Sequence, residues 1–443
     1  MSVGTSIKTW RLQSKLERRF KSGHPWVYSN ELQGSPKGIE PGQPIVLCDA
    51  GGAFLAHGYG SPSSLIAFRV VSRVESEIDA TAPSGVARRM ARAWAMRRAL
   101  GFGEWSCRLV FGEADELPGL IVDRYINDKG RVAVVVQAQS AGADRWTRQG
   151  PGQWGEIWDE FCKLSGFAAD AVVIKNDSSA RKWEGLEIEA PRMIAAGGRA
   201  GLSERELSEF ALKLRPGVVY RADLVNGQKT GFFLDQWQNT QQFIGQMLPA
   251  LAEHKGRAVR ILDLCCYVGQ WSAQLVHALS GIGVQSEVVL MDASKEALEL
   301  AERNVLASAR QGFAPKVQKL CGNVLKDLGE LEAASFDVVI SDPPALIKAR
   351  KDIPTGTHAY LQLHTQALRL VSRGGFVAAC SCSGLLSEEA FTETLAKAAR
   401  RNGLVGAGLQ WVARGGQSPD HPVLASFAEG RYLKAWLGRV EGG

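Results

Sequence analysis

The segment RILDLCCYVG, residues 260–269, has the pattern of a short apolar strand that ends in a turn. From about residue 218 onward such strands alternate with helical patterns, which is typical of a parallel, doubly wound sheet. In a sheet of this kind the ligand binds beyond the carboxyl ends of the strands. The segment therefore predicts an α/β fold for the C-terminal part of the chain, and it makes the residues after each strand candidates for a site.

We expect seven strands in this part of the chain, the last two of them forming a hairpin-like pair. The expected strands span residues 260–264, 288–292, 317–320, 336–341, 375–381, 405–409 and 432–440. Helical periodicity is clearest over residues 294–310, 358–372 and 387–402.

Two further segments precede this sheet. Residues 1 to about 75 carry frequent Gly and Pro between short apolar pieces, which predicts a small barrel or sandwich. An Arg-rich helical pattern and four apolar strands then indicate a small α/β domain. We predict domains at residues 1–78, 79–215 and 216–443. We also expect residues 139–155, rich in Gly, Gln and Ala, to form a surface insertion.

The composition excludes several classes of protein. With 52 Lys and Arg against 46 Asp and Glu, the net charge of +6 is too small for a histone-like protein, so any nucleic-acid site must be local. The eight cysteines include no CxxC pair, which argues against zinc and iron–sulfur sites. No apolar run has the length of a membrane span or of a signal-peptide core. We expect a cytoplasmic protein with free thiols and no bound metal.

The residues after the first three strands indicate an adenosyl ligand that lacks phosphates. Only Gly269 lies in the first turn, so the glycine-rich loop that cradles a pyrophosphate is missing. Asp263 and Asp292 lie at the ends of the first two strands, where Asp292 can bind ribose hydroxyls, and Asn323 after the third can bond an adenine edge. A single acid at a strand end is more often a helix cap. Their order on successive strands favours S-adenosylmethionine as the cofactor.

The ends of the fourth and fifth strands carry the candidate catalytic groups. Asp342-Pro343-Pro344 follows the fourth strand, and its prolines make a rigid turn that holds Asp342 near the cofactor methyl. Ala345 stands where methyltransferases of exocyclic amines usually have an aromatic residue. Cys380 and Cys382 share one side of the fifth strand. A buried cysteine is commonly just a small apolar residue. Together with Asp342, however, Cys382 fits thiolate addition to C6 of cytosine, which activates C5 for methylation.

Several motifs in one order along the chain carry a resemblance to a known family. They are His24-Pro25-Trp26-Val27-Tyr28-Ser29, the stretches 112–120 and 229–236, Asp342-Pro343-Pro344, Ser381-Cys382-Ser383-Gly384, His421-Pro422-Val423 and the stretch 429–434. Through them the chain resembles the bacterial 23S rRNA large subunit methyltransferase I family, which methylates cytosine at carbon 5. The resemblance implies an N-terminal PUA RNA-binding β-barrel, a central α/β domain and a C-terminal Rossmann-like class I methyltransferase domain.

The resemblance also implies roles for individual residues. Cys382 is then the nucleophile and Asp342 the active-site acid, and Ala345, in place of a second cysteine, implies a single-cysteine mechanism. The implied cofactor-binding residues are Gln236, Asp263, Cys265, Tyr267, Gly269, Asp292, Asn323, Asp342 and Pro343.

Basic residues near the N-terminus and on the Arg-rich helix are candidates for binding RNA. They are Lys8, Arg11, Lys15, Arg18, Arg19, His24, Arg88, Arg89 and Arg92. A charge run alone is more often a solvated face. Beside a PUA-like domain, these residues predict contacts with the phosphates of RNA, with 23S rRNA or a large-subunit precursor as the partner.

Two other functions stay open at this point. In one, the chain uses S-adenosylmethionine to methylate a guanine or adenine of rRNA, and Cys382 is structural. In the other, the chain is a non-catalytic RNA-binding protein of ribosome assembly with a methyltransferase fold. The sequence also leaves open whether the chain forms a homodimer.

Overall fold

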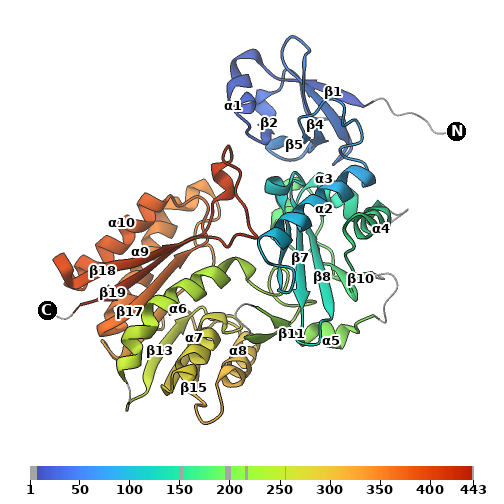
Figure 1. Cartoon of the computed structure of the whole chain (residues 1–443). Coiled ribbons are helices and arrows are strands. Elements are labelled where there is room, and N and C mark those ends of the chain that lie inside the picture. Colours follow the sequence, from blue (N-terminus) through green and yellow to red (C-terminus); the bar gives the residue numbers. More distant parts are fainter. Residues whose placement is uncertain (1–6, 149–152, 195–200, 215–217, 255, 442–443) are drawn as a thin grey trace. The chain divides into compact units, whose positions relative to one another are not determined.

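The computed structural model describes residues 7–148, 153–194, 201–214, 218–254 and 256–441 (Figure 1). The chain divides into two compact units. Unit 1 holds the described residues of Met1–Phe210, Asp223–Leu234 and Pro419–Gly430, and unit 2 holds those of Ala211–Ala222, Asp235–Ser418 and Arg431–Gly443. Within these ranges, no helix is both long and apolar enough to cross a membrane.

The first sheet of unit 1 has the strand order β1-β3-β4-β5-β2. Its strands are β1 (Lys8–Arg11), β2 (Trp26–Tyr28), β3 (Pro44–Cys48), β4 (Phe54–Gly60) and β5 (Ile66–Ser72), and the short helix α1 (Glu17–Lys21) precedes β2. The sheet encloses an apolar cluster that includes Leu12, Phe20 and Phe68. The expected small β-domain is therefore present in this part of the chain.

The second sheet of unit 1 has the order β10-β9-β8-β7-β6. Its strands are β6 (Cys107–Phe111), β7 (Leu120–Ile126), β8 (Val132–Ala138), β9 (Ala171–Ile174) and β10 (Arg192–Ile194). The helices are α2 (Pro83–Ala99), which begins on a proline, α3 (Ala141–Thr147), α4 (Gln153–Ser165) and α5 (Glu204–Ser208). This part of unit 1 therefore combines a five-stranded sheet with helices.

The expectation of a surface insertion at residues 139–155 is wrong where the structure describes it; residues 149–152 lie outside the described ranges. Ser140 accepts a hydrogen bond from the backbone of Ala143 and starts α3, whose residues are largely buried. A Cβ on Gly142 would lie 2.2 Å from the Tyr59 ring. Small residues are therefore present here because α3 packs closely on β4, and not because the segment is a loop.

Unit 2 is built on a seven-stranded sheet with the order β15-β14-β13-β16-β17-β19-β18. The strands are β13 (Val259–Leu264), β14 (Ser286–Asp292), β15 (Lys316–Cys321), β16 (Phe336–Ser341), β17 (Val371–Ser381), β18 (Leu409–Gly415) and β19 (Lys434–Val440). The first five are parallel, and β19 runs antiparallel to both β17 and β18. A small two-stranded sheet, β11 (Phe210–Lys213) with β12 (Val219–Ala222), precedes it.

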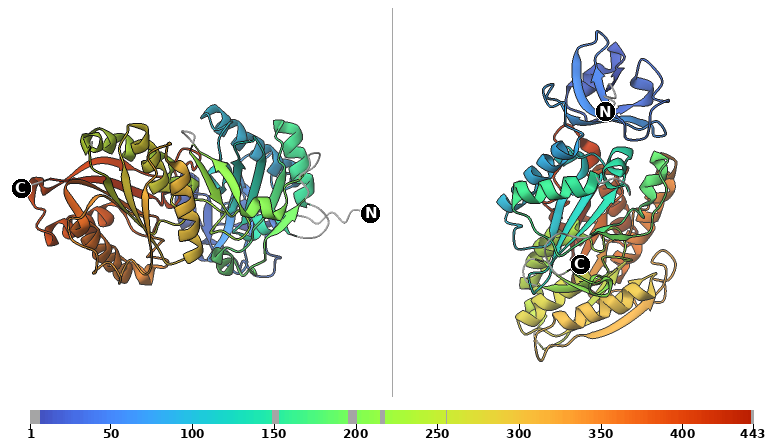
Figure 2. Two further views of the ribbon diagram at one scale, coloured as in Figure 1. Left: turned by 90° about the horizontal axis from the view of Figure 1, so that it is seen from below. Right: turned by 90° about the vertical axis from the view of Figure 1, so that its right-hand side faces the viewer.

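Helices cover both faces of the large sheet (Figures 1 and 2). They are α6 (Trp237–Leu251), α7 (Gln270–Gly281), α8 (Lys295–Ser308), α9 (Ile353–Leu370) and α10 (Glu388–Arg401). Side chains of α9 and α10, such as Leu363 and Ala398, share one apolar cluster with Leu262 and Leu264 of β13. The strand order reverses between β13 and β16, and the edge beyond these two strands is where a sheet of this type holds its ligand.

The expected strands and helices agree with the structure except at a few ends. The strand expected at residues 405–409 is wrong, because residues 406–408 form a 3-10 turn and β18 begins at Leu409. Helix α9 begins at Ile353 and not at His358, since Pro354 occupies its first turn and supplies a start signal. Strand β17 begins four residues earlier than expected.

Candidate active site

The loop after β13 is held in an unusual backbone conformation. Cys265, Tyr267 and Gly269 all have positive φ, at 61°, 48° and 77°. For a residue other than glycine this conformation costs of the order of 1–3 kcal/mol, and it persists where the surroundings enforce it. Here the Tyr267 backbone N–H donates to Asp292 Oδ2 at 3.0 Å, and the Gly269 N–H donates to the Cys266 carbonyl at 2.8 Å. The loop is thereby pinned to the end of the neighbouring strand.

Asp292 and Asn323 lie side by side at the ends of β14 and β15. Each carboxylate oxygen of Asp292 accepts one backbone N–H, from Tyr267 and from Ser294, so the group is fixed and still has lone pairs to offer. The Gly322 N–H donates to the Asp292 carbonyl at 3.0 Å. Asn323 is exposed, and its Oδ1 accepts the Leu325 N–H at 2.9 Å. Among the described residues, no hydrogen bond is formed by its amide NH2 group.

Asp263 has a different environment from the other strand-end acids. It is 1% exposed, and its Oδ2 accepts hydrogen bonds from the Ser272 hydroxyl at 2.7 Å and the Ser272 N–H at 3.3 Å. Burial raises the pKa of this carboxyl to about 7. Its Oδ1 is buried without a hydrogen-bond partner among the described residues. Asp263 therefore ties the first turn of α7 to β13.

The Asp342 carboxylate is positioned by two N–H donors. Gln236 Nε2 donates to its Oδ2 at 2.9 Å, and the Trp271 indole N–H donates to the same oxygen at 3.2 Å. Asn239 Nδ2 in turn donates to Gln236 Oε1 at 2.7 Å, and Asn239 Oδ1 accepts the Gly416 N–H at 3.0 Å. The predicted cofactor residue Gln236 thus orients the predicted catalytic acid.

Cys382 lies just beyond β17, next to the Asp-Pro-Pro turn. Its Sγ is 3.8 Å from the Pro343 carbonyl oxygen, and the side chain is half-buried. A buried hydroxyl network flanks it: the Tyr360 OH lies 2.9 Å from Ser381 Oγ and 3.0 Å from Ser383 Oγ. The structure therefore brings the two predicted catalytic residues to adjoining strand ends, and it fixes the turn that carries the thiol.

Cys380, the nearest cysteine in sequence, differs from Cys382 in burial. The eight cysteines all lie within the described residues, and none of them is joined in a disulfide. Cys380 is fully buried, and burial raises the pKa of its thiol well above the usual value. Burial also raises the pKa of Cys265, which is partly exposed in the loop after β13. Of the two cysteines on the fifth parallel strand, Cys382 is the one that a ligand at the sheet edge can reach.

The groups at this edge fit S-adenosylmethionine. A ribose needs an acceptor such as Asp292, and an adenine edge needs an amide such as Asn323. The loop after β13 offers turned main chain and one glycine, and a Cβ on Gly269 would come 3.2 Å from Ala301. No phosphate cradle is required by such a ligand, and the sequence 260–269 does not supply one.

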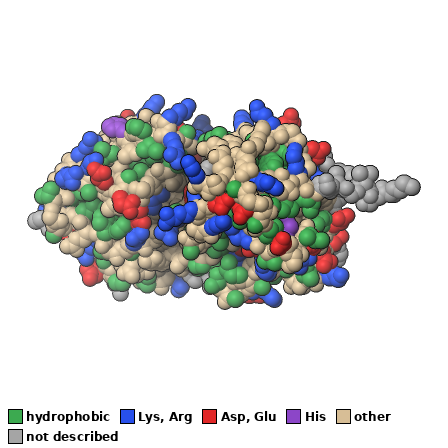
Figure 3. Space-filling model, turned by 90° about the horizontal axis from the view of Figure 1, so that it is seen from above, with side chains coloured by type: hydrophobic (Ala, Val, Ile, Leu, Met, Phe, Trp, Pro, Cys, Tyr) green, Lys and Arg blue, Asp and Glu red, His purple; other side chains and the backbone are tan. Residues whose placement is uncertain are grey.

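The N-terminal basic residues are mostly exposed. Lys8, Arg11, Lys15 and Arg18 are exposed, whereas Arg19 binds the carboxylate of Glu31 at 2.7 Å. His24 is buried, 3.1 Å from Arg19 and 3.3 Å from Glu429. The face shown in Figure 3 carries Lys and Arg side chains interspersed with Asp and Glu, in keeping with the small net charge.

Four arginines of α2, Arg88, Arg89, Arg92 and Arg97, bind acids and carbonyls of unit 1. Arg88 pairs with Asp79, and Arg92 pairs with Glu116, and both are exposed. Arg89 is only 3% exposed, and it donates to the carbonyls of Val71 and Gly85 and to Glu77. The helix therefore has fewer exposed cations than its sequence suggests, because Arg89 and also Arg97 point into the protein.

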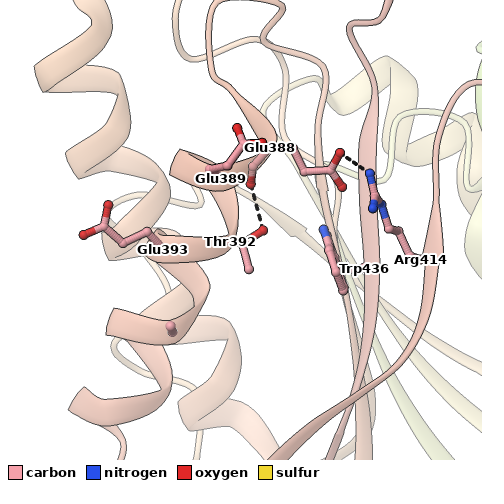
Figure 4. Close-up of a pocket in the computed structure, with 7 residues that line it drawn as sticks. Glu388, Glu389, Thr392, Glu393, Arg414 and Trp436 are labelled. Carbon is pink, nitrogen blue, oxygen red and sulfur yellow. Dashed lines mark hydrogen bonds and ion pairs between the residues drawn. The ribbon is translucent and has the colours of Figure 1, made fainter.

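A separate hollow of about 450 Å³ lies between α10 and the β18–β19 pair (Figure 4). It is lined by Glu388, Glu389, Thr392, Glu393, Ala396, Arg414 and Trp436. The Glu388 carboxylate pairs with Arg414, whose guanidinium lies 5.6 Å from the Trp436 ring. None of the predicted site residues lines this hollow.

Comparison with known proteins gives the family. A PUA-like domain model matches residues 11–73, and a methyltransferase domain model matches residues 255–426. The ribosomal RNA large subunit methyltransferase I of Escherichia coli O139:H28 (strain E24377A / ETEC) is 31% identical, over 99% of this chain and 100% of its own. The chain belongs to this family. The protein of the same name from Erwinia tasmaniensis has the same identity and coverage.

As a member of the ribosomal RNA large subunit methyltransferase I family, the chain is a methyltransferase, and S-adenosylmethionine is its cofactor. Solved structures agree on the fold. A putative S-adenosylmethionine-dependent methyltransferase from Streptococcus mutans has a TM-score of 0.72 at 16% identity and covers 98% of this chain and 100% of its own. A putative methyltransferase in complex with S-adenosylhomocysteine has the same TM-score at 17% identity.

Four residues of this site were not predicted from the sequence. Trp271 and Asn239 hold Asp342 and its partner, and Tyr360 and Lys434 flank the Cys382 turn. Trp271 follows Gly269 by two positions, which is a weak signal. Lys434 gave the clearest signal, since it is the charged residue in the otherwise apolar run from Leu433 to Leu437.

Proposed function

We propose that the chain methylates carbon 5 of a cytosine in 23S rRNA through a covalent adduct with Cys382. The observation that supports this most strongly is the position of Cys382 beside the Asp342-Pro343-Pro344 turn, with the sulfur 3.8 Å from the Pro343 carbonyl oxygen. The name of the 31% identical relatives, ribosomal RNA large subunit methyltransferase I, supports the choice of RNA.

The reaction divides into addition, transfer and elimination. The Cys382 thiolate forms a bond to C6 of the cytosine, and the electron pair of the C5–C6 double bond becomes available at C5. A proton taken up from solvent is shared between Asp342 and N3 of the ring, balances the charge of the adduct, and returns to solvent when the thiolate leaves. The cofactor supplies the methyl group, which C5 takes. A base then removes the C5 proton, the double bond re-forms and the thiolate leaves.

The cofactor is held by the edge of β13, β14 and β15. In this proposal Asp292 accepts the ribose hydroxyls, and the Asn323 amide bonds the adenine. The Cys265–Gly269 loop lies along the cofactor, with Asp263 beneath it. Gln236 and Pro343 contribute by fixing the Asp342 turn rather than by a direct bond.

RNA is held by exposed cations of unit 1. We assign phosphate contacts to Lys8, Arg11, Lys15 and Arg18, which are exposed. Arg88 and Arg92, which are also exposed but paired, are assigned secondary contacts. Arg19, His24 and Arg89 support the fold around these cations, because their side chains bind other protein groups.

Covalent trapping tests the proposal. A fluorine at C5 cannot be removed as a proton is, so large-subunit rRNA that carries 5-fluorocytosine is expected to stay bonded to the wild-type chain in the presence of S-adenosylmethionine. Cys382→Ala is expected to give no adduct. Cys380→Ala is the matched control, because it removes a thiol two residues away, and it is expected to keep the adduct. An adduct that persists in Cys382→Ala would refute the assignment of the nucleophile.

A further inference from the structure

Lys434 is a buried cation next to the Cys382 turn. It is the first residue of β19 and pairs with Ser381 of β17 in the antiparallel register. The residue is only 6% exposed. Its Nζ donates to the Ser383 carbonyl at 3.0 Å and to the Tyr432 carbonyl at 2.9 Å. The ammonium group therefore binds the main chain immediately after the candidate nucleophile.

This ammonium lacks the partner that a buried charge usually has. No carboxylate of the described residues lies within 4.0 Å of Nζ, and its two acceptors are neutral carbonyls. A buried charge without a counter-charge is costly, so an anion close by would stabilise it. Burial lowers the pKa of Lys434, while the charges of Cys382 and Glu388 act in the opposite direction. Cys382 is thus the group whose charge bears most strongly on Lys434.

Other titratable groups face Cys382 from the elements around it. Asp342 follows β16, Cys265 follows β13, Cys380 belongs to β17, and Tyr360 comes from α9. Each of these is neutral or negative. Glu388, at the start of α10, is bound to Arg414. Lys434, which binds the carbonyl of the next residue, is accordingly a cation placed to offset a negative charge on the sulfur.

We infer that Lys434 is a positioning residue that holds Cys382 in the thiolate form and fixes the turn on which the thiolate sits. The inference rests on the proposed function, since it assigns Cys382 as the nucleophile. In the addition step the electron pair of the thiolate goes to C6, and in the elimination step it returns to sulfur. Lys434 keeps its proton throughout and faces the restored thiolate again at the end.

Substitutions of Lys434 can separate a purely structural role from an effect of its charge on the Cys382 sulfur. If only the hydrogen bonds to the two carbonyls matter, Lys434→Gln, which retains an amide donor, should resemble the wild type. If the charge matters, this variant should behave differently and Lys434→Arg should not. An opposite charge within about 4–6 Å lowers the pKa of an acid by about 1–3 units.

The experiment measures the pH dependence of alkylation of Cys382 by iodoacetamide, with peptide mass spectrometry to separate it from the other thiols. In Lys434→Gln the midpoint for Cys382 is expected to rise by about 1–3 pH units, whereas in Lys434→Arg it stays near the wild-type value. The exposed Cys321 of the same chain is the internal control and should not change. Binding of S-adenosylmethionine, followed by calorimetry, verifies that the variant is folded. An unchanged midpoint in a folded Lys434→Gln would overturn the inference.

A second measurement uses the wild-type chain and does not depend on a variant. The quantity measured is the rate with anionic iodoacetate divided by the rate with neutral iodoacetamide. Because an ammonium attracts anions, this ratio should be higher at Cys382 than at Cys321. An equal or lower ratio at Cys382 would also overturn the inference. Both assays omit RNA. They can therefore fail while 5-fluorocytosine still traps Cys382, and they can succeed even if the trapped base is not cytosine.

Discussion

Tyr360→Phe is the substitution that tests most sharply how the structure holds the catalytic turn. Tyr360 is fully buried, and its hydroxyl joins Ser381 and Ser383 at 2.9 and 3.0 Å, on either side of Cys382. The change removes one oxygen and no volume from the apolar core. It leaves the buried Ser381 hydroxyl without this acceptor, which costs about 1–3 kcal/mol.

Two quantities should change in Tyr360→Phe. The free energy of unfolding in urea should fall by about 1–3 kcal/mol. The rate of adduct formation with 5-fluorocytosine RNA should fall by about tenfold or more, because a small misplacement of a reacting group can cost about a hundredfold in rate. Affinity for S-adenosylmethionine should stay unchanged, since Asp292 and Asn323 lie on other strands.

Tyr220→Phe is the matched control for this prediction. Tyr220 is also fully buried in unit 2, and its hydroxyl donates to the Gln270 carbonyl at 3.3 Å. Its loss should lower stability without slowing adduct formation. Wild-type stability together with a wild-type adduct rate in Tyr360→Phe would refute the role of the hydroxyl network.

Three further predictions follow from contacts elsewhere. Gly415→Ala places a Cβ 2.1 Å from Asn239 Oδ1. The free energy of unfolding in urea should therefore fall by about 1–3 kcal/mol, and covalent trapping of 5-fluorocytosine RNA should be slower. Wild-type values of both quantities would contradict this packing. In the wild type, Arg97 binds the buried Asp115 at 2.5 Å. Arg97→Met leaves this carboxylate without its partner, so the free energy of unfolding measured by thermal unfolding should fall by about 3–5 kcal/mol. The pKa of Asp263 is raised from 3.8 to about 7. The native state therefore binds this proton more tightly than the unfolded state does. The stability that this provides is lost progressively as pH rises from about 4 to about 7. Asp263→Asn should therefore gain stability relative to the wild type over that range, and a pH-independent difference between the two would count against the raised pKa.

Much of the fold could be predicted because the large sheet is regular. The segment 260–269 is a buried strand with an abrupt turn, and the strand at 336–341 has the same bounds in the structure as in the prediction. At residues 139–148 the prediction failed because tertiary packing determines the structure there. The Gly- and Ala-rich α3 resembles a loop in sequence, and only its contact with Tyr59 explains why small residues are needed.

The site was predictable where a residue acts through its position after a strand. Asp342 and Cys382 follow β16 and β17, so strand ends alone place them together. Residues that act through other side chains gave little signal. Asn239 lies inside α6 and is linked to Asp342 through Gln236. Similarly, the α2 arginines look like one basic face, but acids from distant positions, such as Glu116, pair with them in the folded chain.

The identity of the methylated nucleoside tests the central claim most directly. Large-subunit rRNA from cells that lack the enzyme would be incubated with the chain and labelled S-adenosylmethionine, then digested to nucleosides and analysed by mass spectrometry. The account predicts that the label appears in 5-methylcytidine with the wild-type chain and is absent with Cys382→Ala. Label in a methylated guanosine or adenosine, or 5-methylcytidine formed by Cys382→Ala, would contradict it.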